Sequence, residues 1–161
     1  MPIKLVLLSL LTGLTLCSAS LAQDIEVHHP FAISTGITAQ TGAAFMIIHN
    51  HGASDDALID VRSPAARLVE LHNHIMSGDA VMSMTHVTGP VPLPAGGELL
   101  LNRGGYHIMF MGLTAPFTDG AVLPVTLVFA HAGEMQIEVP VDQSQFGDMG
   151  ELPMEDMSAG E

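Results

Sequence analysis

Residues 134–141, EMQIEVPV, decide the fold class. Hydrophobic side chains occupy every second position (Met135, Ile137, Val139 and Val141), alternating with Glu134, Gln136, Glu138 and Pro140. Successive side chains of a β-strand point to opposite faces, so this pattern predicts a strand with one face in the core and the other in water. An amphipathic helix would instead repeat its hydrophobic positions every three to four residues.

The rest of the chain repeats the same kind of unit. The other apolar runs are DIEVHHPFAI, GAAFMIIHN, DALIDVRS, ARLVELHN, AVMSMTHV, GELLLN, YHIMFMGL and AVLPVTLVFA. Clusters rich in glycine, asparagine, aspartate or proline, such as NHGASD, PAGG and NRGG, separate these runs and predict turns. Short strands at a spacing of about 8–12 residues are typical of an all-β sandwich or barrel. We therefore predict a single all-β domain.

The two ends of the chain have the composition of segments outside this domain. Residues 1–22 combine Lys4, the apolar run LVLLSLLTGLTL and the small-residue site SLA, which is typical of a cleaved signal peptide. Leu16 stands where a lipoprotein signal needs a small residue before Cys17. We therefore expect cleavage after Ala22 and a periplasmic protein with no membrane insertion. Residues 142–161 are polar and acidic and predict a disordered tail, which leaves residues 23–141 as the folded domain.

The composition of the exported part excludes several classes of protein. The one cysteine of the chain, Cys17, leaves with the signal peptide, so no disulfide, thiolate ligand or thiol nucleophile remains. A blue-copper electron carrier is therefore excluded, because its metal needs a cysteine thiolate. The chain has 17 carboxylates against four basic residues and a net charge of −13. Such a surface repels nucleic acid and attracts cations, so we expect no nucleic-acid partner.

Histidine and methionine are the residues through which this sequence can bind a metal. The chain has nine histidines and eleven methionines, which recur together in ELHNHIM, VMSMTH and YHIMFM. In YHIMFM, strand alternation places His107, Met109 and Met111 on one face. Thioethers are poor ligands for zinc, calcium and magnesium, whereas copper(I) is soft and accepts thioether and imidazole together. One methionine alone would be read as core filler, but recurrence in three segments favours a copper(I) site.

The same segments resemble a known family, the periplasmic copper chaperones of the PCuAC type. The likeness runs from about residue 25 to residue 141 and includes GAAFMIIHNHG, VMSMTHV and VPLPAGGELLLNRGGYHIMFMGL. The family motif is a histidine, a methionine and then His-x-Met, and it falls on His72, Met84, His107 and Met109. Eleven residues separate His72 from Met84 and 22 separate Met84 from His107. Each gap is one residue longer than the family pattern, which leaves open whether His74 or Met82 replaces a matched ligand.

The resemblance implies a cupredoxin-like Greek-key β-sandwich that binds one copper(I) ion per domain through these four residues. It implies a chaperone and not an enzyme. The chaperone would carry copper through the periplasm to an acceptor, either a subunit of cytochrome c oxidase or a Sco-type assembly factor. A periplasmic copper storage or resistance protein would use the same ligands. A zinc-dependent hydrolase is a further alternative, but HNH at 49–51 and at 72–74 is the only hint of the ligand set it needs.

Other histidines and methionines lie outside the motif. His28, His29, His49 and His51 are compatible with a second, weaker site for copper(II) or zinc, although turn and surface roles explain them as well and are the simpler interpretation. Met149, Met154 and Met157 stand among carboxylates of the tail, where they either capture copper loosely or are only solvated.

Overall fold

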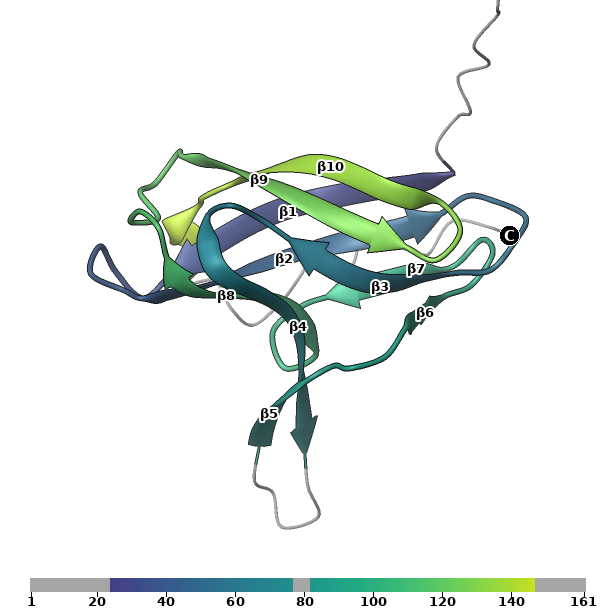
Figure 1. Cartoon of the computed structure of the whole chain (residues 1–161), viewed down its shortest axis with the longest axis horizontal. Helices are drawn as coiled ribbons and strands as arrows, with labels where there is room; N and C mark the ends of the chain where they lie inside the picture. The colour runs from purple at the N-terminus through teal and green to yellow at the C-terminus, as the bar shows by residue number, and fades with distance from the viewer. Residues whose placement is uncertain (1–23, 77–81, 147–161) are drawn as a thin grey trace, which may run out of the picture.

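The computed structural model of the chain describes residues 24–76 and 82–146, which form a sandwich of two β-sheets (Figure 1). The larger sheet has the strand order β1-β2-β7-β8-β4-β5, and the smaller sheet has the order β10-β9-β3-β6. The all-β sandwich expected from the sequence is confirmed. No helix within the described residues is long and apolar enough to cross a membrane.

The strand bounds follow the apolar runs of the sequence. In chain order the elements are β1 (Ile25–Ser34), β2 (Thr41–Asn50), β3 (Asp56–Arg62), β4 (Ala66–Met76), β5 (Met82–His86), β6 (Val91–Leu93), β7 (Glu98–Leu101), β8 (Tyr106–Leu113), β9 (Val122–Phe129), β10 (Gly133–Pro140) and the 3₁₀ turn η1 (Gln143–Phe146). The run EMQIEVPV supplies most of β10, which pairs with β9 along its whole length. Its alternation is realised as predicted, because Val139 is fully buried whereas Glu134, Gln136 and Glu138 are exposed.

The core lies between the two sheets and is built from the inward-facing half of each strand. Ile108 and Phe110 of β8 and Leu127 of β9 are fully buried. Phe110 packs edge-on against Phe117, with ring centroids 5.4 Å apart. Gly42 of β2 lies against the same Phe117 ring so closely that an added Cβ would stand 2.5 Å from ring atom Cε2. A side chain of any size at position 42 would therefore displace a buried aromatic ring.

The edge strand β1 changes its alternation part-way along. Its register against β2 shifts just after His28, where His29 and Pro30 together oppose a single residue of β2. His29 has a φ of 48°, in the left-handed region that non-glycine residues seldom adopt. Such a β-bulge tolerates a proline, because the ladder hydrogen bond is already broken there. Odd-numbered positions such as Ile25 face the core before the bulge, and even-numbered positions such as Ala32 face it afterwards.

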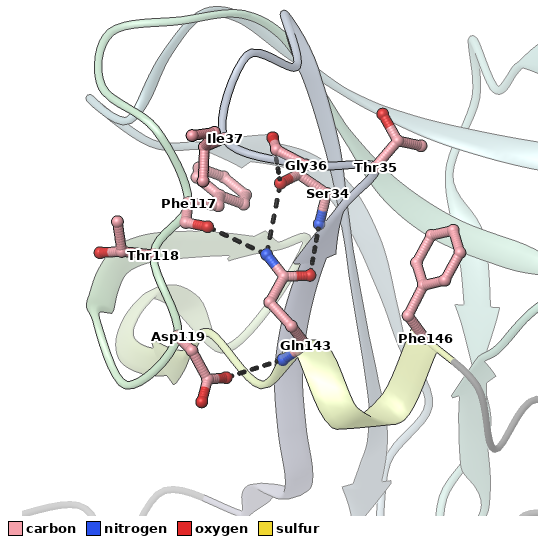
Figure 2. Close-up of a pocket in the computed structure, with 9 residues that line it drawn as sticks. All are labelled: Ser34, Thr35, Gly36, Ile37, Phe117, Thr118, Asp119, Gln143 and Phe146. Carbon is pink, nitrogen blue, oxygen red and sulfur yellow. Dashed lines mark hydrogen bonds between the residues drawn. The ribbon is translucent and has the colours of Figure 1, made fainter.

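The described chain extends past the domain boundary expected at Val141. The side-chain amide of Gln143 donates to the Phe117 carbonyl oxygen at 2.9 Å and accepts from the Ser34 backbone N–H at 3.3 Å. Its backbone N–H donates to the Asp119 carboxylate at 2.9 Å (Figure 2). Polar residues at the start of the expected tail therefore form hydrogen bonds that attach η1 to the sandwich. Figure 2 also shows the surface pocket around Gln143, and none of the described residues that line it is a histidine or a methionine.

Candidate metal centre

Three neighbouring strands, β8, β4 and β5, carry the predicted ligands on the larger sheet. His72 of β4 is the direct cross-strand partner of His107 in β8 and of His86 in β5. Residues directly opposite each other in antiparallel strands share a face, so the three imidazoles form a row. The row lies on the face turned away from the core, because the alternate residues Leu71 and Ile108 are buried inside the sandwich. β4 and β5 continue outward as a hairpin that projects from the body of the molecule (Figure 1).

The two predicted methionines flank this row from opposite directions along the strands. On one side, Met84 of β5 is the cross-strand partner of His74. On the other side, Met109 of β8 is the cross-strand partner of Glu70. All four predicted ligands therefore lie on one face: His72 and His107 are direct neighbours, and each methionine stands one row away from them. Met84 is 48% exposed, so the β5 end of this group is open to solvent.

His107 has a buried imidazole whose hydrogen bond fixes which ring nitrogen carries the proton. It is 2% exposed, and its Nδ1 lies 3.1 Å from the carbonyl oxygen of Gly105. Because a carbonyl can only accept, Nδ1 carries the proton and donates, which leaves the lone pair on Nε2 free. Burial lowers the pKa of His107, an effect to which His74 and His72 add and which the Gly105 hydrogen bond opposes. The ring is therefore neutral at neutral pH, which is the form that binds a metal.

His72 and His74 each keep one buried nitrogen without a partner. The Nδ1 atoms of both rings are buried and make no hydrogen bond with any described residue. The other nitrogen of His72, Nε2, lies 3.0 Å from a carboxylate oxygen of Glu70, to which it donates. A buried polar atom left without a partner costs about 1–3 kcal/mol. A metal ion with imidazole affinity would remove that cost, so the residues present fit a bound metal.

The ring positions keep both His72 and His74 as candidate ligands. The His74 ring centroid lies 4.9 Å from that of His107, whereas the His72 centroid lies 6.0 Å away. Both rings therefore neighbour the His107 ring, and His74 joins the candidate ligands. The three residues do not bring one nitrogen each within 4.8 Å of one another, so a shared ion would need their side chains to move closer. The side chain of Met82, the other alternative, lies outside the described part of the structure, as do Met149, Met154 and Met157.

Two residues of this cluster were missed from the sequence. Glu70 holds His72 and also lies 3.8 Å from His86 Nδ1. A carboxylate that fixes a ligating histidine orients the ring and raises its basicity. The signal was present, because Glu70 precedes His72 by two residues and His86 follows Met84 by two, which places each pair on one face of its strand. We call Glu70, His72, His74, Met84, His86, His107 and Met109 the His–Met cluster.

Comparison with known sequences assigns the chain to a protein family. The sequence model of the LpqE-like family, described as "Putative lipoprotein LpqE-like", matches residues 25–141. The chain belongs to this family. A protein of Leifsonia xyli subsp. xyli (strain CTCB07), itself described as a putative lipoprotein, is 32% identical to this LpqE-like chain over 145 residues. That match covers 83% of the chain and 84% of the relative.

Solved structures show the same sandwich. The apo PCuAC domain of PmoF1 superposes with a TM-score of 0.62 at 25% identity, covering 74% of the LpqE-like chain and 94% of that domain. The copper-bound PCuAC domain of PmoF2 gives a TM-score of 0.60 at 24% identity, over 74% and 93%. The copper(I) form of DR1885 from Deinococcus radiodurans gives 0.56 at 27% identity, over 76% and 82%. The resemblance to the PCuAC family, and with it the cupredoxin-like sandwich, is confirmed.

Proposed function

We propose that this LpqE-like protein binds copper(I) at the His–Met cluster and acts as a copper chaperone. The observation that carries the proposal is the gathering of three histidines and two methionines on one sheet face. The hydrogen bond to Gly105 leaves Nε2 of His107 with its lone pair, and the Nδ1 atoms of His72 and His74 have no hydrogen-bond partner among the described residues. Copper(I) is the ion that accepts both donor types and tolerates few ligands. PmoF2 and DR1885, whose solved structures are described as copper-bound and CuI forms, share the fold.

The proposed ligand set allows copper(I) to be released to an acceptor. Thioethers are neutral, weak donors, and the exposed Met84 stands at the open side of the cluster. An acceptor with a thiolate can therefore displace Met84 first and take over the ion by ligand exchange, while His107 still holds it from the buried side. No step other than ligand exchange is required. The acceptor we propose is the copper centre of a cytochrome c oxidase subunit or a Sco-type assembly factor.

An anaerobic transfer experiment tests the chaperone role. The protein is titrated with copper(I) against a competing chelator, and the loaded protein is then mixed separately with an apo oxidase copper domain and with an apo Sco-type protein. We expect one equivalent of copper(I) to bind at the cluster and to move to the acceptor faster than it dissociates into chelator. Tight binding without transfer to either acceptor class would instead identify a storage or resistance protein. Failure to bind copper(I) would refute the proposal altogether.

We further propose that the protein is exported to the periplasm and cleaved after Ala22. The description of the family as lipoproteins fits an exported protein, but a lipoprotein would carry its anchor on Cys17. Leu16 before Cys17 favours cleavage at SLA instead. The intact mass of the exported protein distinguishes the two: a chain beginning at Gln23 is expected, and a lipid-modified chain beginning at Cys17 would contradict it.

A further inference from the structure

A second group of metal-binding side chains lies on the other edge of the larger sheet. Glu26 and His28 come from β1, His49 from the end of β2, and His51 from the turn that follows. Glu26 is the cross-strand partner of His49, so these side chains share the outward face. We call Glu26, His28, His49 and His51 the β1–β2 cluster. It shares no residue with the His–Met cluster.

The side chains of this cluster converge on one carboxylate oxygen. Oε2 of Glu26 lies 3.0 Å from Nε2 of His51 and 3.4 Å from Nε2 of His28. Among the histidine, cysteine, aspartate and glutamate side chains of residues 24–76 and 82–146, Glu26, His28 and His51 are the one trio whose ligand atoms all lie within 4.8 Å of one another. Ligands at about 2.0–2.1 Å from a tetrahedral zinc ion stand about 3.3 Å apart. The two separations from Glu26 are therefore close to those between ligands of a coordinated ion.

A fourth candidate ligand, His49, stands beside the trio. The His49 ring meets the His28 ring edge-on, with centroids 4.7 Å apart, and stacks on the His51 ring at 5.8 Å. In the structure its Nε2 lies 3.6 Å from Glu98 of the neighbouring strand β7. This distance is too long for a good hydrogen bond, so no strong bond to Glu98 occupies this nitrogen.

The backbone around His28 is adapted to this arrangement. The β-bulge at His29 and Pro30 begins immediately after His28, and His29 takes the left-handed conformation. Bulges re-aim side chains next to binding sites, and left-handed non-glycine residues concentrate at such sites. A hydrogen bond between His51 and Glu26 would by itself need neither the bulge nor the approach of His28 to the same oxygen.

We propose that the β1–β2 cluster is a second metal site, for a divalent ion, and that it prefers copper(II). Its donors are imidazole nitrogens and a carboxylate oxygen, with no thioether, which suits copper(II) and zinc and not copper(I). For such donors copper(II) binds more tightly than zinc, following the general order of divalent-ion affinity. The side chains of Glu26 and His51 are 57% and 58% exposed, so the site is open to solvent. The two clusters would thus separate the two oxidation states of copper on one sheet face.

Copper(II) titration followed by electron paramagnetic resonance tests this site. The parent protein should bind copper(II) with hyperfine structure from imidazole nitrogens, and zinc should displace it only in excess. The double variant His28→Ala/His51→Ala should lose at least about tenfold in copper(II) affinity. His131→Ala is the matched control, because this exposed histidine of the β9–β10 turn belongs to neither cluster, and it should bind as the parent does.

The same variants separate this inference from the proposed function. Copper(I) affinity should be unchanged in His28→Ala/His51→Ala, because the His–Met cluster is intact. Copper(II) affinity should be unchanged in His72→Ala/Met109→Leu, because the β1–β2 cluster is intact. Unaltered copper(II) binding in His28→Ala/His51→Ala would overturn the second site, and so would its loss in His72→Ala/Met109→Leu.

Discussion

Removing the carboxylate of Glu70 should weaken copper(I) binding although Glu70 is not itself a ligand. Glu70 accepts a hydrogen bond from Nε2 of His72 at 3.0 Å and so keeps the proton away from Nδ1. The side chains of Glu70 and His72 are 22% and 13% exposed, so solvent screens the pair only in part. Without Glu70 the His72 ring can rotate or move its proton to Nδ1, and the lone pair that would face the metal is lost.

The size of the effect follows from the kind of hydrogen bond. A bond to a charged group contributes about 1.5–3 kcal/mol and a neutral one about 0.5–1.5 kcal/mol. Glu70→Gln keeps an acceptor and loses only the charge, so we expect copper(I) affinity to fall about tenfold. Glu70→Ala removes the acceptor as well, and the loss should approach the upper part of the range of about 10–100-fold seen for such supporting residues.

The assay is anaerobic copper(I) competition against a chromophoric chelator. Glu98→Gln is the matched control: it removes one negative charge from the same sheet, beside His49 at 3.6 Å, but outside the His–Met cluster. It should leave copper(I) affinity unchanged, which separates a local effect on His72 from a general loss of negative charge. Parent-like affinity in both Glu70→Gln and Glu70→Ala would falsify the assignment of His72 Nδ1 as a ligand.

Three further predictions concern the ligands, the pH dependence and the core. Met84→Leu and Met109→Leu should each reduce copper(I) affinity strongly. Unfolding measurements should show that each variant loses less than about 1.5 kcal/mol of stability, because leucine keeps the apolar volume. Parent-like copper(I) binding in both variants would shift the site toward Met82 or Met111. Burial lowers the pKa of His107, so the unfolded chain takes up a proton first as pH falls below about 6.5. The apoprotein should therefore lose stability from that pH downward until the folded-state pKa is passed, and copper(I) affinity should fall on the same side of neutrality; a flat affinity profile between about pH 8 and 5 would exclude imidazole ligands. Gly42→Ala should destabilise the fold by about 1–3 kcal/mol in denaturant titration, because its Cβ would meet the buried Phe117 ring at 2.5 Å, and an unchanged midpoint would show that the ring moves aside freely.

The sequence by itself determined the features that depend on neighbours along the chain. Alternation in EMQIEVPV is a local property of an extended backbone, and it gave the strand and its buried face correctly. Strand alternation also puts His107 and Met109 on one side of β8, whatever strands lie beside it. The chemistry of imidazole and thioether without cysteine pointed to copper(I) with no reference to the fold.

Only the tertiary structure decided which strands lie side by side and in what register. The pairing of β4 with both β8 and β5 sets His72 opposite His107 and brings His74 and Glu70 into the same cluster. His107 becomes buried, and its pKa falls, because of the neighbours that this pairing supplies. Register between distant strands is fixed by core packing and loop closure over the whole chain, so no single segment encodes it.

The β1–β2 cluster also depends on both the sequence and the tertiary structure. A strict alternation read from the sequence fails within β1, because the bulge at His29 and Pro30 exchanges the two faces of the strand. The register then places Glu26 beside His49, which lies 23 residues away in the chain. The sequence supplied four candidate histidines. The pairing of β1 with β2 selected three of them and added the Glu26 carboxylate, on which His28 and His51 converge. Only the structure could do this, because cross-strand distances depend on register and not on composition.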